Sequence, residues 1–80
     1  MKYYKDEPLS RFNFWSGAKT NADELTPDEL DQIGDELEAN DFFGGKIPSD
    51  TEINDLFWFD FDVALQFIGL TESEVDKRNK

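Results

Sequence analysis

Carboxylates are the only reactive side chains in this sequence that are both numerous and regularly spaced. The 80 residues include nineteen acidic and eight basic ones, for a net charge of −11, and residues 20–62 hold fourteen acids against one base. Among them, Asp28, Asp31, Asp35 and Glu38 recur at intervals of three or four. On a helix this spacing forms one stripe with neighbours about 5–6 Å apart.

The position of this stripe along its helix is unfavourable for local stability. Asp35 and Glu38 fall toward the C-terminal end, where the helix dipole disfavours negative charge. Like charges at i and i+4 also repel by a few tenths of a kcal/mol. A pattern that opposes local stability indicates a use, and we expect the stripe to bind a basic protein surface.

Two further interpretations of the stripe stay open. Its spacing approximates the separation of successive phosphates along a nucleic-acid strand. The chain would then be a nucleic-acid mimic that inhibits a host nucleic-acid-binding protein. The plainer interpretation is a solvated face that keeps the protein soluble.

Several classes of function are disfavoured. The chain has no Cys and no His, so it lacks a thiolate nucleophile, the usual general base at neutral pH and the commonest metal ligand. It has no phosphate-binding glycine motif and no EF-hand pattern. We therefore expect no enzyme, no catalytic residue, no metal site and no cofactor. The scarcity of Lys and Arg also disfavours direct binding to nucleic acid.

The sequence predicts a folded cytoplasmic protein that does not bind membranes. No apolar run approaches the roughly 18–20 residues that a membrane span needs, and the N-terminus lacks the apolar segment of a signal peptide. A hydrophobic content of 38% argues against disorder despite the charge.

A small helical fold must position these carboxylates. We predict an all-α single domain over residues 1–80, with four to five short helices around the aromatic-rich segment 51–70. That segment is apolar on nearly every side as a helix, which is typical of a central element. We expect it to form helices 50–58 and 61–68.

The boundaries of these two helices have local signals. Asp60 or Asp62 is a good N-cap for the second helix, through its carboxylate. Gly69 suits a left-handed residue just past its end, and Leu70 suits the apolar contact of a Schellman motif.

Local signals predict the starts of three helices. Thr26 with Glu29 predicts a helix over 27–39, with a buried stripe of Leu30, Ile33 and Leu37. Ser49 with Glu52 forms a second capping box. Thr71 is expected to start a last short helix, whose acids come early and bases late, as the helix dipole favours. A first helix is expected over about 9–24, with a kink at Gly17 or a late start near Phe14 as alternatives. Gly17 and Ala18 could instead allow another helix to approach closely.

Irregular segments are expected between and beyond these helices. Residues 1–8 are interpreted as an N-terminal arm and residues 77–80 as a frayed tail. In the loop 40–48, Phe42, Phe43 and Ile47 are expected to fold under as a lid on the core. The alternative function is a structural or assembly protein that self-associates through exposed aromatics, namely Tyr3, Tyr4, Phe42 and Phe43.

Three segments, FNFWSGAK, ELDQIGDELE and INDLFWFDFD, resemble a group of small, acidic, uncharacterised proteins encoded by bacterial prophages and related mobile elements. The resemblance covers about residues 9–70. It implies a mobile-element setting, but it assigns no catalytic or ligand residue to any position.

Overall fold

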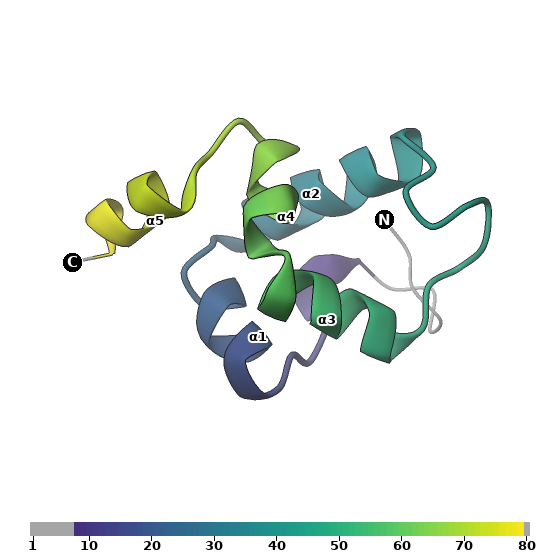
Figure 1. The fold of residues 1–80 in the computed structure, drawn as a ribbon, viewed down its shortest axis with the longest axis horizontal. Helices are drawn as coiled ribbons and strands as arrows, with labels where there is room; N and C mark the ends of the chain where they lie inside the picture. The colour runs from purple at the N-terminus through teal and green to yellow at the C-terminus, as the bar shows by residue number, and fades with distance from the viewer. Residues whose placement is uncertain (1–7, 80) are drawn as a thin grey trace.

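The computed structural model describes residues 8–79, and within this range the chain is all-α (Figure 1). A 3-10 turn, η1 (Leu9–Arg11), precedes α1 (Ser16–Ala22), α2 (Pro27–Ala39), α3 (Asp50–Phe59), α4 (Phe61–Gln66) and α5 (Glu72–Arg78). The predicted fold class is confirmed. The N-terminal arm, apart from Pro8, lies outside the described residues, as do Tyr3, Tyr4 and Lys80.

Both predicted capping boxes are present and begin α2 and α3, and a third box, at the predicted helix start Thr71, begins α5. In the first, the Glu29 N–H donates to Thr26 Oγ1 at 3.2 Å, and the Thr26 N–H donates to Glu29 Oε1 at 2.9 Å. Each box satisfies two backbone donors that a helix start leaves without partners. These short helices therefore begin where the sequence predicts.

The bend between α3 and α4 lies at Asp60, as predicted, but the mechanism differs. Asp60 is the N-cap residue of α4 and makes no side-chain capping bond, so the predicted carboxylate cap is wrong. Its backbone carbonyl instead accepts the N–H groups of Val63 and Ala64 at 3.0 and 3.2 Å. The Asp60 side chain remains exposed.

The predicted Schellman motif after α4 is confirmed. Gly69 has φ of 72°. The Leu70 N–H donates to the Leu65 carbonyl at 3.0 Å, and the Gly69 N–H donates to the Gln66 carbonyl at 3.1 Å. These are the two bonds that define the motif.

A continuous first helix over 9–24 is not formed, so this prediction is wrong. The backbone is extended at Phe12 (ψ 136°) and Trp15 (ψ 161°), and α1 begins only at Ser16. The Trp15 N–H donates to the side-chain Oδ1 of the fully buried Asn54 on α3, at 3.0 Å. This long-range bond replaces a helical one, so the late start near Phe14 is closer to the structure.

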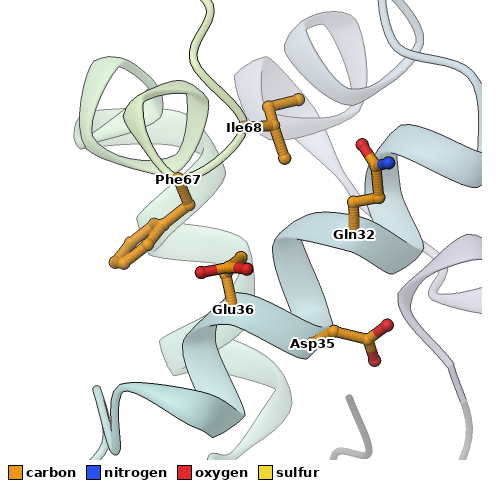
Figure 2. Close-up of a pocket in the computed structure, with 5 residues that line it drawn as sticks. All are labelled: Gln32, Asp35, Glu36, Phe67 and Ile68. Carbon is orange, nitrogen blue, oxygen red and sulfur yellow. The ribbon is translucent and has the colours of Figure 1, made fainter.

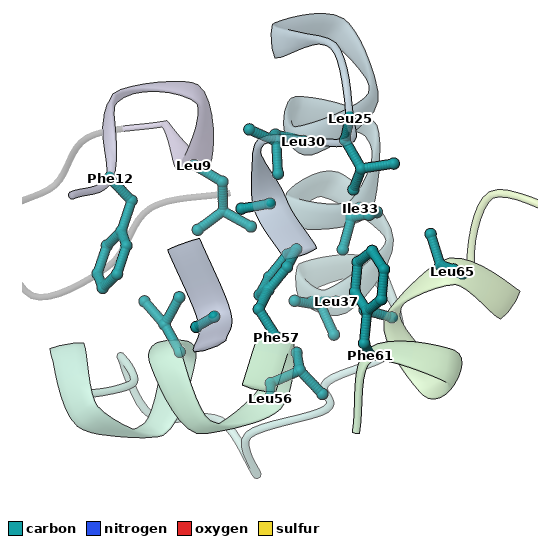
Figure 3. Packing of buried hydrophobic residues seen from close by; sticks show 14 of the residues in the cluster. Leu9, Phe12, Leu25, Leu30, Ile33, Leu37, Leu56, Phe57, Phe61 and Leu65 are labelled. Carbon is teal, nitrogen blue, oxygen red and sulfur yellow. The ribbon is translucent and has the colours of Figure 1, made fainter. Parts of the chain in front are cut away.

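One cluster of buried apolar side chains draws on every element (Figure 3). Phe57 is completely buried, with the rings of Phe14 and Phe61 4.8 and 6.3 Å away. The cluster comprises Leu9, Phe12, Ala18, Ala22, Leu25, Leu30, Ile33, Leu37, Ile53, Leu56, Phe57, Phe61, Ala64, Leu65 and Val75. The predicted stripe of α2 is therefore buried, and segment 51–70 supplies much of the core.

Segment 51–70 is nevertheless not buried on every side. Trp58 and Phe59 are 40% and 66% exposed, and their rings stack 4.7 Å apart. Trp58 covers Gly17, where the absence of a side chain lets α1 and α3 approach. The predicted close approach at Gly17 is confirmed, with Ala18 fully buried beside it.

The loop after α2 forms only part of the predicted lid. Phe43 packs against the core, whereas Phe42 and Ile47 are 43% and 65% exposed. The loop starts with a second Schellman arrangement, because Asp41 has φ of 52° and the Phe42 N–H donates to the Leu37 carbonyl at 3.0 Å.

The last described residues of the chain fall within the segment 77–80 that is predicted to fray. Helix α5 continues through Arg78. The Arg78 guanidinium donates to both carboxylate oxygens of Glu29, and the Asn79 side chain donates to the Glu24 carbonyl at 3.0 Å. These bonds attach α5 to the start of α2.

Candidate interaction site

The four predicted partner-binding carboxylates all lie on α2, but their surroundings differ. Asp28 is exposed in the first turn, where the helix dipole favours a negative charge. Asp31 is half-buried, and Asp35 and Glu38 are exposed toward the C-terminal end. The helix therefore presents the predicted spacing without presenting all four groups equally to solvent.

Asp31 has a structural contact that the sequence did not predict. Its Oδ1 accepts the Ser10 N–H at 3.0 Å, and its Oδ2 accepts the Ser10 hydroxyl at 3.1 Å. The Asp31 carboxylate therefore attaches η1 to α2, because one side chain satisfies both a backbone and a side-chain donor of the 3-10 turn. Because both of its oxygens already accept hydrogen bonds from Ser10, Asp31 is the least available of the four carboxylates to bind a partner protein.

Asp35 and Glu38 also take part in interactions of their own. Their exposure keeps them within reach of a partner, which would compete with these interactions. Asp28, in the first turn, and Glu36, next to Asp35, extend the exposed acidic surface along the helix.

A groove of about 390 Å³ lies between α2 and the end of α4 (Figure 2). It is lined by Gln32, Asp35, Glu36, Phe67 and Ile68. In Figure 2, Glu36 and Gln32 extend from α2 toward Phe67 and Ile68, whereas Asp35 points away from these two apolar residues. Both apolar residues are half-buried. Apolar surface thus lies directly beside the acidic face.

Phe67 and Ile68 could not be assigned to this surface from the sequence, because nearly thirty residues separate them from the end of α2. The signal available was the Schellman ending at Gly69, which places Ile68 in the turn that follows α4. Its position beside α2 is a tertiary property.

Glu29, which flanks the predicted stripe, is committed to structure. The Arg78 guanidinium bonds to both of its oxygens, with Nη1 2.8 Å from Oε2, and the Glu29 side chain is only 18% exposed. These hydrogen bonds from Arg78, assisted by bonds from Thr26 and by the positive charge, lower the pKa of Glu29 to about 2, although burial opposes the shift. Glu29 therefore stays ionised and joins α2 to α5.

Within residues 8–79 no group of three or more acidic side chains is arranged to hold a metal ion. In the same range, no helix has the length and apolar character needed to cross a membrane. No family model, curated protein or solved structure matches the chain, so these comparisons assign it to no family.

Proposed function

We propose that this chain is a non-enzymatic acidic module that binds a basic surface of another protein in the cytoplasm. Its charge surplus carries the proposal. Even one-to-one pairing of all eight basic residues with acidic ones would leave eleven carboxylates without a basic partner. The exposed groups on α2, Asp28, Asp35 and Glu38, are the proposed electrostatic guides, with Asp31 in a secondary role because Ser10 occupies it.

Steering by such a surface raises the association rate and weakens as salt screens it. A partner is first captured from a bacterial lysate at low and at physiological salt, and its association rate with the purified chain is then measured. Asp35→Asn combined with Glu38→Gln should slow association about two- to tenfold, as expected for two exposed charges of about 0.2–1 kcal/mol each with partial additivity.

The matched control is Asp62→Asn combined with Glu72→Gln, because it removes the same two charges from α4 and α5. Equal slowing by both pairs would assign the effect to net charge and not to α2. Association that is insensitive to salt would refute the electrostatic proposal altogether.

The sharper form of the proposal is a nucleic-acid mimic from a prophage or related mobile element. Its distinguishing outcome is competition, because a mimic displaces DNA or RNA from the captured partner. A partner that binds nucleic acid and the chain simultaneously would exclude mimicry while leaving the interaction module intact.

The alternative function, self-assembly through exposed aromatics, is favoured by the exposure of Trp58, Phe59 and Phe42. Phe43 is a weaker candidate because it packs against the core, and Tyr3 and Tyr4 lie outside the described residues. Sedimentation velocity tests this alternative. Concentration-dependent association that Phe59→Ser abolishes would support it, and a monomer at high concentration would refute it.

A further inference from the structure

A second groove, on the flank of α3, has an apolar floor and an acidic rim. It has a volume of about 270 Å³ and is lined by Phe42, Phe43, Glu52, Asp55, Leu56 and Asp60. Phe42 is 43% exposed, and its ring makes T-shaped contacts with the rings of Phe43 and Phe67 at centroid distances of 5.0 and 5.8 Å. An aromatic ring is thus held by two others and left partly open to a ligand.

The rim carries three carboxylates around this floor. Asp55 and Asp60 are exposed, and the side chain of Glu52 is 40% exposed. The chain's own Lys46 lies at the edge, with Nζ 3.7 Å from Glu52 Oε2 and a side chain that is 68% exposed. A cation is therefore already attracted to one side of the groove, through a loose contact that a better-placed cation would displace.

An aromatic face surrounded by carboxylates fits one side chain better than the others. The planar guanidinium of Arg stacks on aromatic rings and donates to carboxylates in pairs, while its aliphatic stem covers apolar surface. Lys offers a compact, strongly hydrated charge and makes the stacking contact less well.

We propose that this groove binds an arginine side chain from an Arg-rich segment of a partner protein. The guanidinium stacks on Phe42 and bonds to Asp55 and Asp60, and the groove supplies a short-range anchor that complements the charges of α2. The inference rests on the proposed function only in requiring a basic partner, since its residues are separate from those of the α2 surface.

The probe is a fluorescent, glycine-spaced arginine peptide, with lysine and citrulline versions of the same length, and the measurement is fluorescence anisotropy with the full chain. We expect the arginine peptide to bind roughly threefold more tightly than the lysine peptide. The neutral citrulline peptide should bind far more weakly than either.

Three variants test the groove itself. Asp55→Asn combined with Asp60→Asn should weaken arginine-peptide binding about four- to tenfold, at two- to fivefold per exposed charge with partial additivity. Phe42→Leu keeps an apolar side chain but removes the aromatic face, and should cost about twofold or more. Lys46→Ala removes the internal competitor and should tighten binding about twofold.

The matched control for charge is Asp62→Asn combined with Glu72→Gln, whose residues do not line the groove. If this pair weakens binding as much as the Asp55 and Asp60 pair, or if the lysine peptide binds as tightly as the arginine peptide, the arginine site is refuted. If only the Asp35 and Glu38 pair weakens binding, the α2 function stands and the groove does not. If the chain binds no basic peptide, the groove is refuted, and the proposed function is then judged separately by the captured protein.

Discussion

The contact between Gly17 and Trp58 yields the sharpest prediction about the fold. A β-carbon added at Gly17 would lie 2.3 Å from Nε1 and 2.6 Å from Cδ1 of the Trp58 indole. Non-bonded atoms do not approach so closely, so either α1 must move away from α3 or the indole must rotate outward. Trp58 is 40% exposed and has room to rotate, but rotation would disturb its stacking on Phe59 at 4.7 Å.

The expected magnitude is a balance of two opposing effects. Overpacking of this kind costs about 1–3 kcal/mol, whereas Gly to Ala in a helix gains about 1 kcal/mol. We therefore expect Gly17→Ala to lower the free energy of unfolding by up to about 2 kcal/mol. Urea denaturation followed by far-UV circular dichroism measures this change.

A double-mutant cycle with Trp58→Ala isolates the contact. Without the indole, Gly17→Ala should become stabilising by up to about 1 kcal/mol, because only the gain in helix propensity remains. Thr20→Ala, at an exposed position of the same helix, is the control for propensity alone. The reasoning fails if Gly17→Ala is destabilising to the same extent in both backgrounds.

Two further predictions concern α2. Asp41→Gly should raise the free energy of unfolding by about 1 kcal/mol, because Asp41 adopts a left-handed φ of 52° at the negative end of the helix. A thermal melt showing no gain would contradict this. Glu29→Gln keeps the capping box and should lower the free energy of unfolding by about 1 kcal/mol at neutral pH. The loss is this small because the Arg78 side chain is 38% exposed and solvent screens the ion pair. The pKa of Glu29 is lower in the folded state than in the unfolded chain. Its contribution to the stability of the fold is therefore present above about pH 4.5 and is lost as the pH falls toward about 2. Melts of the two proteins should converge over that range, and a constant difference would contradict the assignment.

The proposed sites differ in how much of each is visible in the sequence. The spacing of Asp28, Asp31, Asp35 and Glu38 defines one helix face by periodicity alone. The sequence could not reveal that Ser10 occupies Asp31, because that contact spans twenty-one residues. The α3 groove is harder still to foresee, since it combines a loop ring, Phe42, with carboxylates on α3 and at the α3–α4 junction.

The sequence by itself determined the features that depend on neighbouring residues. The capping boxes at Thr26, Ser49 and Thr71 set the starts of three helices, and Gly69, with its left-handed backbone, closes the turn after α4. These signals are local because they act through hydrogen bonds that span three to five residues.

Only the tertiary structure decided which apolar and charged groups are buried, paired or left at the surface. The Trp15 N–H donates to Asn54 on α3 where a continuous first helix would give it a local partner. Arg78 bonds to Glu29 from forty-nine positions away, and Trp58 stays partly exposed within an aromatic-rich segment. The physical reason is that burial and long-range bonding depend on which helices meet. The periodicity of a sequence does not show which helices pack together when the described α-helices are only six to thirteen residues long.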